Sequence, residues 1–205
     1  MSQLVGRRPT NTLTVSVLVL WFLLVLVGSL LGVFKGNASQ PPVLLGLAVA
    51  LPVLVFVLAW GGSASMQRLV LSANLRTITL LQSGRVIGVV FLTLYALGLL
   101  PGIFALPAGL GDVAIGLTAP LVASVLASKA RYRLGLLAVW NILGMLDLLV
   151  AVSLGILTSR STLGLLAGTT SSALVVAFPL SLIPTFLVPA YLILHLIALD
   201  RVRRM

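Results

Sequence analysis

Six apolar runs, each close to the length of a membrane-crossing helix, divide this sequence of 205 residues. A bilayer core about 30 Å thick needs about 20 apolar residues per helix. The runs cover about residues 13–34, 42–60, 86–104, 112–128, 134–157 and 173–199. Only 8% of the residues are charged, against about 25% in a soluble domain. We therefore predict an all-α fold, a polytopic integral membrane helical bundle of six transmembrane helices that forms a single domain over residues 1–205.

Basic residues separate these runs in an alternating pattern. With a cytoplasmic N-terminus, the inner segments hold Arg7, Arg8, Arg68, Arg76, Arg85, Lys129, Arg131, Arg133, Arg201, Arg203 and Arg204. The outer segments hold only Lys35 and Arg160. Cytoplasmic loops of membrane proteins are rich in Lys and Arg. We therefore expect the protein to be integral to a cell membrane, specifically a bacterial cytoplasmic membrane, with both termini on the cytoplasmic side.

Residues 66–83, between the second and third runs, place polar side chains at helical spacing opposite apolar ones. This pattern predicts a short cytoplasmic helix that lies in the membrane interface. We expect anionic lipid head groups near five arginines: Arg68, Arg76, Arg201, Arg203 and Arg204. A polar connector without a specific partner is the simpler alternative for residues 66–83.

The scarcity of reactive side chains excludes several chemistries. The chain has no Cys and one His, and Asp and Glu together number three. Iron–sulfur clusters and disulfides are therefore excluded, and one histidine cannot hold a bis-His haem. We expect no metal site. The basic residues that give the chain its net charge of +10 lie between the apolar runs. In that position they indicate membrane topology rather than nucleic-acid binding.

Asp147 is the strongest indication of a function. At about 1.5 Å per residue it lies about 20 Å from Leu134, the inner end of its run, and so near the middle of the membrane. Ionisable groups at that depth are costly and usually functional. The structural alternative is a protonated carboxyl that bonds to a neighbouring helix, with Tyr95 as the partner.

Asp112 is expected to begin the fourth run. There its carboxylate can accept hydrogen bonds from free helix N–H groups, and this N-cap role is the favoured interpretation. Residues 101–112, PGIFALPAGLGD, contain two prolines and three glycines. Irregular backbone at membrane depth is tolerated where it lines a cavity, so this stretch is also a candidate outer mouth.

The sixth run contains Pro179, Pro184 and Pro189, which predict kinks. Beyond them, Tyr191 and His195 share a helical face that we expect to point into the bundle. His195 is the one candidate axial ligand for a pigment, although the sequence specifies no cofactor. Ordinary contacts at the membrane interface are the favoured alternative for this histidine.

Small residues form stripes on the fourth and fifth runs. They are Gly116, Ala119, Ala123, Ala127, Gly144 and Ala151. Small side chains let helices approach closely in lipid. We expect these stripes to be packing seams within the bundle, with self-association or contact with other membrane subunits as the alternative.

Two functions are consistent with these features. The favoured one is binding or translocation of a small solute or of protons through a cavity around Asp147, with Asp112, Tyr95, Tyr191 and His195 as binding or relay candidates. The alternative is a structural or accessory subunit of a larger membrane complex. An intramembrane enzyme with Asp147 or His195 as general base is least favoured, because paired carboxylates and nucleophile–base spacing are missing.

Overall fold

The computed structural model describes residues 9–128 and 130–205, which contain helices and loops and no β-strand. In chain order the elements are α1 (Pro9–Leu30), α2 (Val43–Gly62), α3 (Ala64–Ser72), α4 (Leu75–Leu81), η1 (Gln82–Gly88), α5 (Val89–Ala96), α6 (Gly102–Ala127), α7 (Arg133–Leu157), η2 (Ser172–Val176), η3 (Ile183–Leu187) and α8 (Val188–Arg203). Helices α4, η1 and α5 form one rod. Within the described residues, six helices are long and apolar enough to cross a membrane, as predicted.

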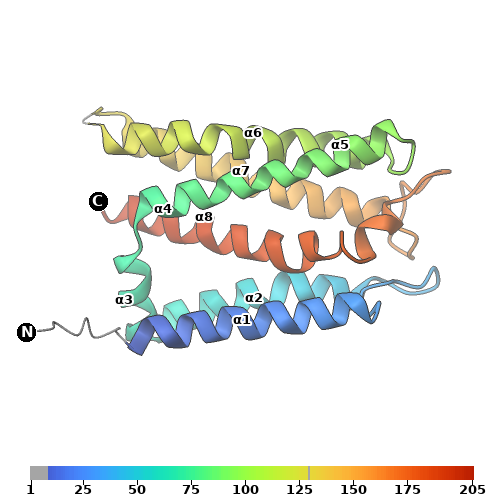
Figure 1. Cartoon of the computed structure of the whole chain (residues 1–205), viewed down its shortest axis with the longest axis horizontal. Coiled ribbons are helices and arrows are strands. Elements are labelled where there is room, and N and C mark those ends of the chain that lie inside the picture. Colours follow the sequence, from blue (N-terminus) through green and yellow to red (C-terminus); the bar gives the residue numbers. More distant parts are fainter. Residues whose placement is uncertain (1–8, 129) are drawn as a thin grey trace, which may run out of the picture.

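The long helices lie roughly parallel, and α8 runs between the α1–α2 side and the α4–α7 side of the molecule (Figure 1). Helix α3 lies across one end. The start of α1, the connection between α6 and α7, and the C-terminus lie at this same end (Figure 1). We call it the basic end because it carries Arg68, Arg76, Arg131, Arg133, Arg201, Arg203 and Arg204. Arg7, Arg8 and Lys129 lie outside the described residues.

The third span begins earlier than predicted. The predicted bounds of this span and of the interfacial helix before it were therefore wrong. The rod covers Leu75–Ala96, not residues 86–104. Asn74 begins it, because its side-chain Oδ1 accepts hydrogen bonds from the backbone N–H groups of Arg76 and Thr77. The predicted interfacial helix over residues 66–83 is correspondingly reduced to α3. Thr79 and Gln82, which were expected at the membrane surface, are buried in the rod.

The fourth span also begins earlier, and this places Asp112 in the middle of a helix. The connection before it is the short stretch at residues 97–101, where Gly98 has a φ of 72° that favours glycine and Pro101 precedes the first helical residue. Helix α6 continues from Gly102 through residues 106–111 to Ala127. The predictions of an N-cap role for Asp112 and of an irregular outer mouth at residues 101–112 were therefore wrong.

The sixth span is shorter than predicted at its start. The predicted helix over residues 173–199 contains the short helix η2, a turn and a cis Phe178–Pro179 peptide bond before its continuous part begins at Ile183. Pro184 lies in the π-helical turn η3, and Pro189 lies in the first turn of α8. Residues 158–182 therefore form a long irregular connection at the end of the molecule opposite the basic end (Figure 1).

Besides a cluster of Leu148, Val188 and Leu192 between α7 and α8, two apolar clusters lie at different levels along α6. One lies toward the opposite end and contains Phe91, Leu100, Phe104, Ala105, Ala108, Val175 and Ile183. The other lies toward the basic end and contains Ile115, Ala119, Val122, Leu137 and Trp140. Along α6, residues 109–114 separate the two clusters, and this interval holds Asp112. The polar residues described next thus lie between these two apolar clusters.

Candidate functional site

Arg85, in the middle of the third span, is the centre of the site. Its side chain is fully buried. Its Nε donates a 2.7 Å hydrogen bond to Oδ1 of Asp112 on α6, and its Nη2 donates to Oδ2 of Asp147 on α7. Its Nη1 donates to the carbonyl oxygen of Gly144 at 3.0 Å. We call Arg85, Asp112 and Asp147 the charge cluster. It joins the third, fourth and fifth spans by charge-assisted hydrogen bonds.

His195 of α8 extends this network to the sixth span. Its Nδ1 lies 2.7 Å from Oδ1 of Asn141, and its Nε2 lies 3.3 Å from Nη1 of Arg85. Asn141 uses its Nδ2 to donate to the carbonyl oxygen of Leu137, so its Oδ1 faces the histidine as an acceptor. The ring is therefore a neutral imidazole that donates from Nδ1 and accepts at Nε2. Because both nitrogens are engaged, the arrangement does not fit an axial-ligand role.

Glycines let the helices approach closely at the charge cluster. A Cβ atom at Gly111 of α6 would collide with the carboxyl group of Asp147. A Cβ atom at Gly144 of α7 would lie 2.6 Å from Nε2 of His195 and 3.2 Å from Nη1 of Arg85. A larger residue at either position would push a charged or hydrogen-bonded side chain out of place. These glycines are therefore part of the site rather than ordinary packing.

The charge cluster has an imbalance that is important for its chemistry. One guanidinium faces two carboxyl groups, so the cluster carries a net charge of −1 when both carboxyls are ionised. The third acid of the chain, Asp200, pairs instead with Arg204 at the basic end. A net charge between apolar clusters, around a fully buried guanidinium, is unfavourable. Uptake of one proton or one monovalent cation would make the cluster neutral.

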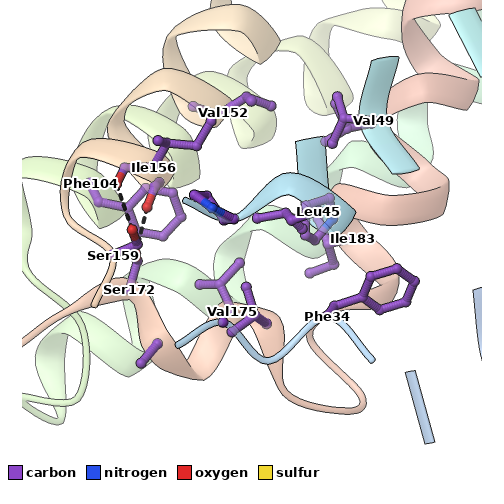
Figure 2. Close-up of a pocket in the computed structure, with 18 of the residues that line it drawn as sticks. Phe34, Leu45, Val49, Phe104, Val152, Ile156, Ser159, Ser172, Val175 and Ile183 are labelled. Atoms are coloured by element: carbon purple, nitrogen blue, oxygen red, sulfur yellow. Dashed lines mark hydrogen bonds between the residues drawn. The ribbon is translucent and has the colours of Figure 1, made fainter. Parts of the chain in front are cut away.

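An elongated cavity of about 290 Å³ connects the charge cluster with the end of the molecule opposite the basic end. Figure 2 shows side chains of α2, α7 and the connection to α8 pointing into it, with Leu45 and Ile183 on one side and Val152 and Ile156 on the other. Asp112 lines its inner part. The remaining polar lining lies at the mouth: Lys35, Ser159, Arg160, Ser161 and Ser172.

The structure brings together three of the residues singled out in the sequence. Asp112, Asp147 and His195 were expected at three different depths, but all three surround Arg85. Tyr191 lies nearby on α8, and its phenol oxygen packs against Gly84. Tyr95 does not take part. It packs against Gly102, is 42% exposed, and lies ten residues beyond Arg85, about 15 Å along the rod. The partner of Asp147 is Arg85 rather than Tyr95.

Sequence reasoning missed Arg85, because it was placed among the cytoplasmic cations. One signal could have identified it. Ionisable groups inside a membrane are usually paired with one another, and Asp147 lacked an obvious partner. Arg85 lies between two apolar stretches, ITLL (78–81) and VIGVVFL (86–92). Extending the third span back to Leu75, about three helical turns, would have placed this arginine in its middle.

The small-residue stripes lie where α6 and α7 meet other elements, with one exception. Ala119 and Ala123 are buried, and a Cβ atom at Gly116 would lie 2.7 Å from the backbone nitrogen of Val86. Ala151 packs beside the apolar cluster near the opposite end. Ala127 is exposed, so the α6 seam ends at Ala123. None of the contacts requires a second chain.

The chain matches the model of a known protein family. A family model described as "Domain of unknown function (DUF8737)" matches residues 42–203. The matched part contains α2 to α8 and the whole charge cluster. It also contains the cavity lining apart from Phe34, Lys35 and Gly36. No curated protein and no solved structure matches the chain.

Proposed function

The chain belongs to the DUF8737 family, whose function is unknown, and we propose that it is a membrane protein that binds a small, largely apolar solute and exchanges a proton at the charge cluster. One observation carries this proposal: Asp112 lines the cavity and at the same time pairs with the buried Arg85. A solute in the cavity would therefore reach the group whose charge state sets the charge of the cluster.

The proposed membrane orientation places the basic end in the cytoplasm, according to the positive-inside rule. The cavity mouth then faces the outside, and the five arginines expected near anionic lipid lie at the cytoplasmic surface. The apolar surfaces of α1 and α2, of which α2 has no buried residue, would face lipid.

A labelling experiment tests this orientation. The chain has no Cys, so single cysteines at Ser39→Cys and Arg203→Cys give clean reporters. We expect a membrane-impermeant maleimide to label Ser39→Cys in intact cells and Arg203→Cys only after the membrane is opened. Equal labelling of both positions in intact, sealed cells would contradict the orientation.

Charge balance supports the proton part of the proposal. With one proton on either carboxyl group, the cluster is neutral, and with none it carries a single negative charge. Arg85 itself stays protonated and cannot carry the proton. Exchange must therefore involve Asp112 and Asp147, of which Asp112 faces the cavity. Such intramembrane carboxyls are typical of proton-coupled membrane proteins.

Proteoliposomes that contain the pH dye pyranine test this function. We expect the wild-type protein to accelerate equilibration of an imposed pH difference compared with protein-free vesicles. Asp112→Asn and Asp147→Asn should each lower the rate to that of protein-free vesicles, because the remaining Arg–Asp pair is already neutral and has no reason to take up a proton.

Asp200→Asn is the matched control, since it removes the one side-chain carboxyl group outside the cluster and makes the same chemical change. We expect it to keep the wild-type rate. If the wild-type protein gives no flux above protein-free vesicles, or if all three variants behave alike, proton exchange at the cluster is not the function.

The weak attachment of α1 favours a second candidate function, an accessory subunit of a larger membrane complex. The contacts of this helix with the described part of the chain include aromatic contacts of Trp21 and Phe22 with Phe186 and the hydrogen bond between Ser29 and Ser181. It exposes most of its apolar side chains and lies outside the family match. Mild detergent extraction should then recover the chain with stoichiometric partners, which should be lost when residues 1–34 are deleted.

A further inference from the structure

We propose that the cavity binds a single-chain amphiphile with an anionic head group, with the chain inside the cavity and the head group between Lys35 and Arg160. This inference rests on the proposed solute-binding function and adds the chemical class of the ligand. The apolar cavity supports the hydrocarbon chain, the cations at its mouth support the anionic head group, and Asp112 at its floor supports the orientation of the ligand.

The interior of the cavity fits a hydrocarbon chain. Its walls between the mouth and the floor are apolar, with Phe104, Val152 and Ile183 among them (Figure 2). Along α7 the lining extends from Leu148 to Ile156, about 12 Å. A volume of about 290 Å³ holds about ten water-sized groups at ~30 Å³ each. This suits one chain of medium length better than the two chains of a phospholipid.

The mouth of the cavity has cations without acidic partners. Lys35 and Arg160 both line it and are exposed. The Nε of Arg160 donates to Oγ of Ser171 at 3.2 Å, a neutral partner. The three acids of the chain are occupied elsewhere, two by Arg85 and one by Arg204. Two positive charges at the edge of an apolar cavity are complementary to an anionic head group.

The floor of the cavity determines the orientation of the ligand. Asp112 would repel an anion that moved to the inner end, whereas Lys35 and Arg160 attract it at the mouth. The head group also keeps its contact with water there, so its charge does not have to be desolvated. The hydrocarbon chain then points toward Phe104 and the charge cluster.

Equilibrium dialysis of radiolabelled decyl sulfonate against the full chain in phosphatidylcholine nanodiscs tests this inference, with empty nanodiscs as the background. We expect saturable binding of one molecule per chain. Unlabelled decyl sulfonate should compete best, decanol less well and decyltrimethylammonium least. The double variant Lys35→Gln/Arg160→Gln should weaken decyl sulfonate binding about 25-fold, because each cation is worth about a factor of five. It should leave decanol competition unchanged.

Two control variants make the result specific. Arg131→Gln/Arg133→Gln removes the same charge at the basic end and should have no effect. Val152→Trp should fill the cavity and abolish saturable binding of all three amphiphiles, with circular dichroism to verify that it folds. Adding phosphatidylglycerol, an anionic lipid with two chains, to the nanodiscs tests the single-chain requirement: we expect it not to compete, and competition would contradict that requirement.

The possible outcomes separate this inference from the function on which it rests. If decanol competes as well as decyl sulfonate and the Lys35/Arg160 variant binds normally, the anionic head group is wrong while solute binding in the cavity stands. If none of the three amphiphiles binds saturably, or if Val152→Trp folds and still binds them, the cavity is not the binding site and the proposed function loses its solute.

Discussion

Replacement of Arg85 by Gln is expected to lower the free energy of unfolding by about 3–5 kcal/mol, because removal of one partner from a buried ion pair leaves an uncompensated charge. Here the loss affects two carboxyl groups at once, since Asp112 and Asp147 both bond to Arg85. The amide of Gln cannot supply the three separate donors that now reach Asp112, Asp147 and the carbonyl of Gly144. Native domains are stable by only about 5–15 kcal/mol, so the folded population should fall sharply.

Unfolding of the purified protein in mixed micelles with increasing SDS, followed by circular dichroism, measures this effect. Arg203→Gln is the matched control, because Arg203 is exposed at the end of α8 and should change stability by no more than about 0.5 kcal/mol. If the two variants unfold at the same SDS fraction, Arg85 does not hold the spans together.

A triple variant separates charge from packing at the cluster. Arg85→Gln combined with Asp112→Asn and Asp147→Asn replaces all three ionisable groups with neutral amides, which keep the size of the two aspartates and shorten the arginine. Buried ion pairs are often no more stabilising than uncharged replacements, so we expect the triple variant to regain most of the stability lost in Arg85→Gln. A triple variant no more stable than Arg85→Gln would show that the shape of the arginine matters more than its charge.

The sequence predicted the number and type of the long helices, because an apolar run of about 20 residues has few other stable forms. It predicted their boundaries less well, for a specific physical reason. Polar residues were interpreted as membrane surface, but Gln82, Arg85 and Asp112 are buried within helices. A buried polar residue with a partner on another helix has the same sequence signature as a surface residue, and only the tertiary structure distinguishes them.

The candidate site shows the same limit. Asp147 was singled out from its depth alone. Asp112 was singled out as a helix N-cap and His195 for its helical face, whereas the structure places both beside Arg85. Their convergence depends on α6 beginning at Gly102, which brings Asp112 to the level of Asp147. It also depends on Arg85 lying inside the rod. One boundary shifted by about ten residues moves a side chain by about 15 Å along its helix, enough to hide a hydrogen-bonded cluster.

Gly144→Ala is expected to destabilise the protein by about 1–3 kcal/mol, the usual cost of adding a methyl group to a filled core. The new Cβ atom would lie 2.6 Å from Nε2 of His195 and 3.2 Å from Nη1 of Arg85. The imidazole cannot easily retreat, because Asn141 holds its other nitrogen and Trp140 packs against the ring. We therefore expect the loss of stability to be accompanied by loss of proton flux in proteoliposomes, since Arg85 must shift away from its carboxylates.

Gly135→Ala on the same helix isolates the cause of that effect. Both substitutions replace glycine with alanine in α7, which by helix propensity alone should stabilise the protein by up to about 1 kcal/mol. At Gly135 nothing lies within 4 Å of the added Cβ atom, so this gain should appear without a penalty and the flux should be unchanged. The two variants are thus expected to change stability in opposite directions in the same SDS titration. Equal changes would mean that α7 does not approach His195 and Arg85 as closely as the charge cluster requires.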